Sequence, residues 1–131
     1  VFMSNCLFCQ IVAGKIPCYK VYEDTDFLAF LDINPLNPGH ILLMPKKHYR
    51  WVLDVPKFSQ YWEVAGSLAK KIKKSLKADN INFITLGYEI NHAHIHVIPR
   101  FSDDDLGTTV DWRKKKKLSQ KEMEEIGRRC L

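Results

Sequence analysis

The sequence contains no apolar run that approaches the roughly 20 residues of a membrane-spanning helix. It also has no segment with the basic, apolar and small-residue order of a secretory signal peptide. We therefore expect a cytoplasmic protein that does not associate with membranes.

Cysteine is scarce, with four among 131 residues. A cytoplasmic protein rarely forms disulfides, and a chain of this length can bury a core large enough to fold without them. We interpret the cysteines as free thiols or metal ligands. The length fits a single domain over residues 1–131, of which residues 1–5 are expected to be flexible.

An excess of one charge along the whole chain is also missing. The net charge is +5, from 20 Lys and Arg against 15 Asp and Glu, and the RKKKK run of Arg113–Lys117 supplies five positive charges by itself. Such local basicity does not make a broad nucleic-acid-binding face, so nucleic acid is not an expected partner. The run itself predicts a solvated loop, and contact with RNA or phosphate is the alternative.

Five short segments have the apolar or alternating pattern of β-strands. They are Tyr19–Glu23, Phe27–Ile33, Ile41–Met44, Asn82–Leu86 and Ala93–Ile98. The third segment is apolar throughout, which predicts that neighbouring elements cover both of its faces. The dense turn formers of Asn34–Gly39 predict a loop just before it.

Two segments predict longer helices, and Cys6–Val12 predicts a short helix or turn. Apolar residues recur at i+3 and i+4 between residues 58 and 76, with Asp54 as a plausible N-cap and Pro56 in the first turn. Near the C-terminus, Ser119 and Glu122 form a capping box. The sequence therefore predicts an α+β fold: a five-stranded antiparallel sheet with one long helix and a C-terminal helix. Residues 102–131 would form an extension with the basic loop and that last helix.

Three histidines alternate with apolar residues at His92, His94 and His96. Alternate residues of a strand share a face, so the three rings would line one face while Ala93, Ile95 and Val97 face the core. Neighbouring histidines would be about 6–7 Å apart at Cα and the outer two about 13 Å apart. The three could not easily share one metal ion on a straight strand, so we expect them to have different roles.

Imidazole chemistry suggests what those roles are. A neutral imidazole is a nucleophile, a base or a hydrogen-bond donor, depending on its tautomer. A middle histidine can attack phosphorus while a neighbour donates to a phosphate oxygen, which gives a covalent intermediate on the protein. A backbone carbonyl can fix the attacking tautomer. The alternatives are a metal site built on paired histidines and a purely structural role.

The stretch from His92 to Arg100, H-x-H-x-H-V-I-P-R, resembles the signature of the histidine-triad (HIT) family in its Hint-like branch. Further segments resemble the same family, and the match runs from about Cys6 to Arg100. They are Cys6–Val12, Ile16–Pro17, Tyr22–Ile33 and Pro38–His48. The resemblance implies a five-stranded antiparallel sheet, joined across a homodimer into a larger one. It also implies a purine nucleotide bound in a cleft beside the histidines.

The resemblance also implies a role for each site residue. His94 would attack the α-phosphate, His96 would contact phosphate or the leaving group, and His40 would complete the histidine cluster. Asp32 would accept hydrogen bonds from the ribose hydroxyls. Six apolar residues would wall the base pocket, with ordinary core packing as the alternative: Leu7, Phe8, Ile16, Phe30, Ile33 and Leu42.

A zinc site is a further implication. Cys6-x-x-Cys9 supplies only two of the four ligands that structural zinc needs. In family members with the same motif, two histidines complete the site, and they correspond here to His48 and His92. We thus expect a structural zinc ion with four protein ligands, against the alternative of buried thiols. Cys18 and Cys130 have no such pattern.

The expected activity is hydrolysis of nucleoside phosphoramidates or related nucleotidyl substrates through a covalent nucleotidyl-histidine at His94. One alternative is a dinucleoside polyphosphate hydrolase or phosphorylase. Another is a zinc-stabilised nucleotide- or RNA-binding module without catalysis. The sequence departs from the family at Tyr88 and Glu89, in a shortened turn, and a carboxylate facing phosphate would repel it. This departure slightly favours the binding module.

Overall fold

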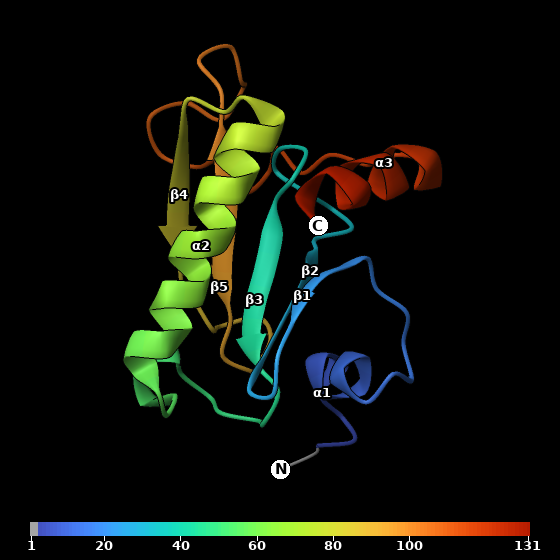
Figure 1. Cartoon of the computed structure of the whole chain (residues 1–131), viewed down its shortest axis with the longest axis vertical. Helices are drawn as coiled ribbons and strands as arrows, with labels where there is room; N and C mark the ends of the chain where they lie inside the picture. Colours follow the sequence, from blue (N-terminus) through green and yellow to red (C-terminus); the bar gives the residue numbers. More distant parts are fainter. Residues whose placement is uncertain (1–2) are drawn as a thin grey trace.

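The computed structural model describes residues 3–131, so the expected flexibility of residues 1–5 falls partly outside the described residues. The elements follow in the order α1 (Leu7–Val12), β1 (Lys20–Glu23), β2 (Phe27–Leu31), β3 (Ile41–Pro45), a 3-10 turn (Val52–Asp54), α2 (Phe58–Leu76), β4 (Asn80–Ile84), β5 (Ile95–Arg100) and α3 (Gln120–Cys130) (Figure 1). Within residues 3–131, no helix combines the length and the apolar character needed to cross a bilayer.

The strands form one antiparallel sheet in the order β1-β2-β3-β5-β4, which confirms the predicted α+β fold. Figure 1 shows α2 lying along one face of the sheet, with α1 and α3 at the side of β1 and β2. The buried side of α2 packs on the sheet in the main core, where the Tyr61 hydroxyl donates to the backbone oxygen of Leu43 at 2.8 Å.

Strand β3 is buried on both faces, as its apolar run predicts. Ile41 and Leu43 belong to the main core under α2. Leu42 and Met44 belong to a second cluster that contains Phe8 of α1. One face of the sheet therefore supports the long helix, and the opposite face holds the short N-terminal helix.

The start of the long helix differs from the prediction, because Asp54 is not its N-cap. Asp54 ends the 3-10 turn, and α2 begins at Phe58 after Lys57, whose φ is 57° and whose side chain makes no capping hydrogen bond. Pro56 explains the difference, since a residue before proline is disfavoured in the helical region. Val55 is accordingly extended, with ψ of 124°, and it separates the turn from the helix.

The C-terminal helix begins as predicted. The backbone N–H of Glu122 donates to the Ser119 hydroxyl at 3.1 Å, and the backbone N–H of Ser119 donates to the Glu122 carboxylate at 3.0 Å. This reciprocal pair is the capping box, and it satisfies two backbone donors that a helix start would otherwise leave exposed.

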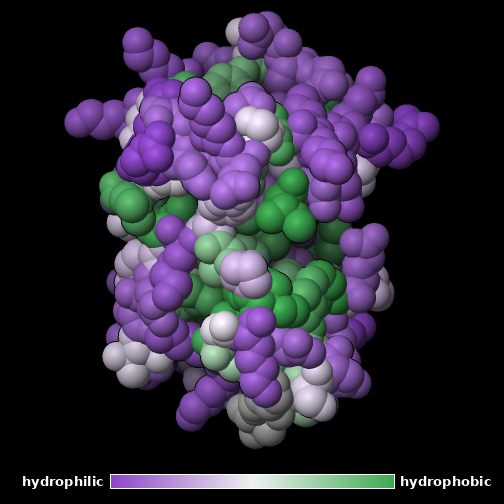
Figure 2. Space-filling model, turned by 90° about the vertical axis from the view of Figure 1, so that its right-hand side faces the viewer, coloured by the Kyte–Doolittle hydropathy of each residue, from purple (hydrophilic) through white to green (hydrophobic). Residues whose placement is uncertain are grey.

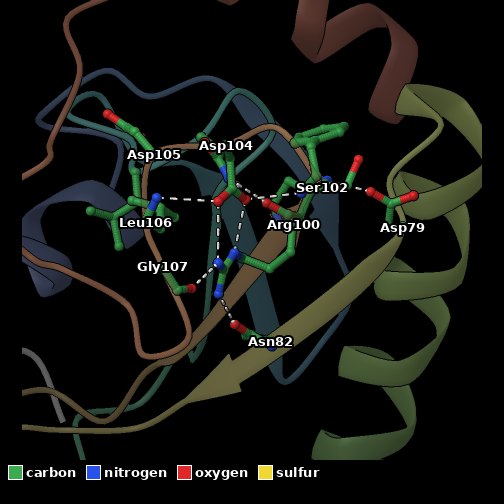
Figure 3. A network of polar contacts seen from close by, with 12 residues as sticks. Asp79, Asn82, Arg100, Ser102, Asp104, Asp105, Leu106 and Gly107 are labelled. Atoms are coloured by element: carbon green, nitrogen blue, oxygen red, sulfur yellow. Dashed lines mark hydrogen bonds and ion pairs between the residues drawn. The ribbon is translucent and has the colours of Figure 1, made fainter.

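Arg100 and Asp104 form a polar network at the end of β5 (Figure 3). The guanidinium donates to both carboxylate oxygens of Asp104, at 2.9 and 3.2 Å, and to Asn82 at 2.8 Å. The amide of Asn37 donates to Asp104 at 3.0 Å and to the backbone oxygen of Pro99 at 2.9 Å. Arg100 holds the pKa of Asp104 below its ordinary value. The network ties the loop before His40 to β5, and it thereby helps to place that histidine.

Candidate active site

The three alternating histidines lie on one side of the sheet, but they do not share one continuous strand. Strand β5 begins at Ile95, so His92 and His94 precede it, which corrects the prediction of a strand from Ala93. The β3–β5 ladder ends at the pair Leu43–Ile95, and the backbone N–H of Ala93 donates instead to the backbone oxygen of Tyr49 at 2.7 Å.

The two faces of this segment differ as the alternation predicts. Ala93, Ile95 and Val97 belong to the main core. The rings of His94 and His96 face the other way, with centroids 4.9 Å apart, and both line a cavity.

The tautomer of His94 follows from its hydrogen bond. Its Nδ1 lies 2.7 Å from the backbone oxygen of His92. A carbonyl oxygen can only accept, so Nδ1 carries the proton and Nε2 keeps a free lone pair. Burial lowers the pKa of His94 below its ordinary value, which keeps the ring neutral. A buried neutral imidazole with a free lone pair is suited to nucleophilic attack.

His40 and His96 form a directed pair. The backbone N–H of Leu36 donates to His40 Nδ1 at 3.1 Å, so the His40 proton is on Nε2. His40 Nε2 lies 2.9 Å from His96 Nδ1, which must accept this proton's hydrogen bond. His96 therefore carries its own proton on Nε2. These two hydrogen bonds leave the neutral His96 ring with its Nε2–H as a hydrogen-bond donor at the cavity.

This pair gives a prediction about pH. Burial lowers the pKa of His40 and of His96 to about 3, below the roughly 6.5 of an unfolded histidine. Between these values the unfolded chain binds protons that the folded chain does not, so stability falls as pH drops from about 6.5 toward 3. We expect ¹⁵N NMR of the rings at pH 5 to show both as neutral Nε2–H tautomers. Titration of either ring near pH 6.5 would contradict the assignment.

The cavity beside the histidines measures about 500 Å³. Its lining includes His94 and His96 and all seven residues predicted to bind the nucleotide: Leu7, Phe8, Ile16, Phe30, Asp32, Ile33 and Leu42. Figure 2 shows apolar side chains gathered around a hollow on the side of the molecule that carries α1 and α3. The structure thus brings together residues that are up to 89 positions apart (7 to 96).

Asp32 lies just after β2 and is one of the charged residues of this lining. It accepts a hydrogen bond from the backbone N–H of Asn34 at 2.9 Å, and its carboxylate lies 3.7 Å from His40 Nε2. Burial raises the pKa of Asp32 above its ordinary value. Glu89, the residue that departs from the family, is exposed and also lines the cavity.

Several lining residues escaped the sequence analysis. Trp112 packs its ring against His96 with a centroid distance of 4.9 Å, and Lys115 of the basic run lines the same cavity. A single tryptophan beside a basic run in a polar stretch is the one signal that could have marked this segment. Cys18 and Ile90 also line the cavity, and no pattern distinguishes them.

Cys6, Cys9, His48 and His92 form a second cluster, with ligand atoms that all lie within 4.8 Å of one another. His92 Nδ1 is 3.4 Å from Cys6 Sγ and 3.5 Å from Cys9 Sγ, and His48 Nδ1 is 3.4 Å from Cys9 Sγ. Tetrahedral zinc, with bonds of about 2.3 Å to sulfur and 2.0–2.1 Å to nitrogen, separates these atoms by about 3.5–3.6 Å.

The orientation of His92 also suits a metal. Its Nε2 lies 2.8 Å from the backbone oxygen of Pro45, so Nε2 donates and Nδ1 presents its lone pair toward the two thiols. Metal-binding histidines commonly donate their second nitrogen to such a carbonyl. The four residues therefore fit zinc in donor type and spacing, and His92 also fits it in tautomer.

Comparison with known proteins places the chain in a family, since residues 13–103 match the HIT domain. The chain is 42% identical over 116 residues to an uncharacterized HIT-like protein of Borreliella burgdorferi, covering 80% of this chain and 82% of that protein. It is 35% identical over 114 residues to the adenosine 5'-monophosphoramidase HNT1 of Saccharomyces cerevisiae, covering 83% and 70%. It is 33% identical over 130 residues to the adenylylsulfatase HINT3 of Arabidopsis thaliana, covering 94% and 66%.

Solved structures of similar proteins share the fold. A HIT-like protein from Bartonella henselae has a TM-score of 0.85 at 29% identity, covering 98% of this chain and 96% of that chain. A zinc-bound histidine triad family protein from Mycobacterium smegmatis has a TM-score of 0.78 at 32% identity, covering 96% and 90%. The family match spans most of the chain, and relatives above 30% identity cover most of its length, so this protein belongs to the HIT family and has Hint proteins among its relatives.

Proposed function

We propose that the protein hydrolyses nucleoside phosphoramidates or related nucleotidyl substrates through a covalent nucleotidyl-histidine at His94. One observation carries the proposal: the His92 carbonyl holds the proton of His94 on Nδ1, which leaves Nε2 free at a cavity wall beside the donor His96. The relatives support the proposal, because two of them are named as enzymes that act on adenosine nucleotides: an adenosine 5'-monophosphoramidase and an adenylylsulfatase.

The cavity lining suggests how a purine nucleotide would bind. The base would lie among the six apolar side chains of the predicted base pocket, which include Leu7 and Leu42. The ribose hydroxyls would donate to Asp32. The α-phosphate would then reach His94 and His96, whose rings are neighbours. An apolar pocket with a few polar groups at one end is typical of small-molecule sites.

The chemistry takes two steps. His94 Nε2 forms a bond to the α-phosphorus as the bond from phosphorus to the leaving nitrogen breaks. The His96 Nε2–H can hydrogen-bond to that nitrogen or to a phosphate oxygen. His96 is neutral and carries a single ring proton, so giving that proton to the leaving nitrogen would turn the ring into an anion. The proton that neutralises the departing amine therefore comes ultimately from solvent. Water then attacks phosphorus, the bond to Nε2 breaks, and the nucleoside monophosphate leaves.

A structural zinc ion belongs to the same proposal, with Cys6, Cys9, His48 and His92 as its ligands. When bound, zinc would link α1 to the segments after β3 and before β5. Four protein ligands leave no open position, so its role would be stability rather than reaction. Zinc in a structure of a similar protein supports this assignment.

A homodimer and a cytoplasmic location stay predictions. Strand β4 is at one edge of the described sheet, and it carries the exposed Phe83, with the exposed Leu86 just after the strand. An unpaired strand edge with apolar neighbours favours pairing with another chain. Sedimentation of the purified protein measures the oligomeric state directly.

The experiment that tests the activity is intact-mass analysis of the protein mixed with an adenosine phosphoramidate and quenched in the first turnovers. We expect a covalent adduct of one adenosine monophosphate, which peptide mapping should locate at His94. Parallel turnover of adenylylsulfate and a diadenosine polyphosphate would identify the preferred leaving group. Tight nucleotide binding without any adduct or turnover would support the binding module instead.

A further inference from the structure

Three charged residues line the nucleotide cavity among residues 3–131: Asp32, Glu89 and Lys115. The rings of His96 and of His40 behind it are neutral, because burial lowers their pKa to about 3. Two carboxylates and one ammonium group leave the wall with a net charge of −1, and without Lys115 the net charge would be −2. A nucleotide phosphate is itself negative, so such a wall would repel the group on which the chemistry takes place.

The basic run lies in an exposed loop, in which Lys116 alone is half-buried, but this loop is anchored near Lys115. Trp112, three residues before it, packs on the ring of His96. Lys116, the next residue, donates from its backbone N–H to Pro35 at 2.7 Å and from its side chain to the Leu36 oxygen at 2.5 Å. These contacts hold the basic run against the loop that leads to His40, and they keep Lys115 at the cavity.

The charge of Lys115 acts on three groups of the site. It lowers the pKa of Asp32, of His40 and of His96, although burial has the larger effect on each. Glu89, the second carboxylate of the lining, is exposed at the same cavity. An α-phosphate at His94 and His96 would thus share the cavity with two carboxylates and a single ammonium group.

We propose that Lys115 is a substrate-binding residue that contacts the phosphate of the nucleotide and offsets part of the negative charge of the two carboxylates of the cavity. The remainder of the basic run does not share this role, since Lys115 is its one member that lines the cavity in the described structure. The inference rests on the proposed function, because it requires a nucleotide in this cavity. It assigns to the run a single phosphate contact in place of an RNA-binding surface.

The experiment compares the affinities for AMP and adenosine by titration calorimetry at low and high salt. In Lys115→Gln, we expect the affinity for AMP to fall about fivefold at low salt and less at high salt, because salt screens exposed charges. The affinity for adenosine should not change, and Lys115→Arg should retain the affinity for AMP. Lys117→Gln is the matched control, because it removes the same charge from an exposed position in the same run.

The outcomes separate the two proposals. If the wild-type protein binds AMP and Lys115→Gln binds it equally well, the phosphate contact is wrong while the proposed function stands. An equal loss of AMP affinity in Lys115→Gln and Lys117→Gln would also overturn the phosphate contact, because the overall positive charge of the basic run would then explain the effect. Equal losses of affinity for AMP and adenosine would mean that Lys115 only helps to shape the cavity, and they would also overturn the phosphate contact. A wild-type protein that binds neither compound would refute both proposals.

Discussion

Replacing His94 by alanine is expected to lower kcat for an adenosine phosphoramidate by at least about 1,000-fold. The substitution removes the Nε2 lone pair that the His92 carbonyl makes available, and no other ring at the cavity can replace it. The proton of His96 Nε2 leaves no lone pair there, because His96 Nδ1 accepts from His40. Single-turnover kinetics with substrate in excess of its dissociation constant would measure the effect.

The same experiment needs a control for binding and folding, because His94 is buried. AMP affinity and thermal unfolding should stay close to the wild type in His94→Ala, so the loss should fall on kcat. His96→Asn keeps a donor at the neighbouring position, and we expect a smaller loss of about 10- to 100-fold. Undiminished hydrolysis in His94→Ala, or an adduct that still forms, would refute the nucleophile assignment.

Much of the fold was predictable because its signals are local. The apolar run of β3 predicts a strand that is covered on both faces, and both faces are buried. The capping box at Ser119 depends on two residues three positions apart, and it forms as predicted. Such features need no knowledge of the rest of the chain.

The errors arise where distant segments decide a boundary. Strand β5 begins at Ile95 because the ladder to β3 ends there, while Ala93 bonds to Tyr49, which is 44 positions away (49 to 93). Strand β4 begins at Asn80, two residues before the predicted start, because it pairs with Arg100. A polar residue such as Asn80 favours a turn in the sequence, and only its pairing with Arg100 places it in the strand.

The candidate site shows the same division. The alternating histidines and the C-x-x-C motif are visible in the sequence, and resemblance to a family connects them with Asp32 and the apolar lining. The groups that set the tautomers belong to the backbone, such as the Leu36 N–H that donates to His40 and the His92 carbonyl that accepts from His94, and the sequence does not identify them. Trp112 and Lys115 reach the cavity through the path of a loop, which depends on contacts such as that of Lys116 with Leu36.

Removing the proposed zinc site is expected to produce the largest loss of stability. In Cys9→Ser, we expect the purified protein to lose most of its zinc and at least about 3 kcal/mol of unfolding free energy. Structural zinc contributes directly to folding, with apparent binding free energies of about 10–16 kcal/mol in zinc-finger peptides. Metal analysis and denaturant unfolding with and without a chelator would measure both effects.

Cys18→Ser is the matched control, because this half-buried thiol lines the cavity beside His94 and His96 and lies outside the cluster of Cys6, Cys9, His48 and His92. It should keep one zinc ion per chain and the wild-type response to chelator. A wild-type protein that contains no zinc after expression in zinc-supplemented medium, and that a chelator does not destabilise, would favour plain buried thiols.

Since His92 donates to Pro45 and presents Nδ1 to the thiols, its replacement by alanine should reproduce the zinc loss of Cys9→Ser. Zinc retention in both variants would mean that other ligands hold the ion.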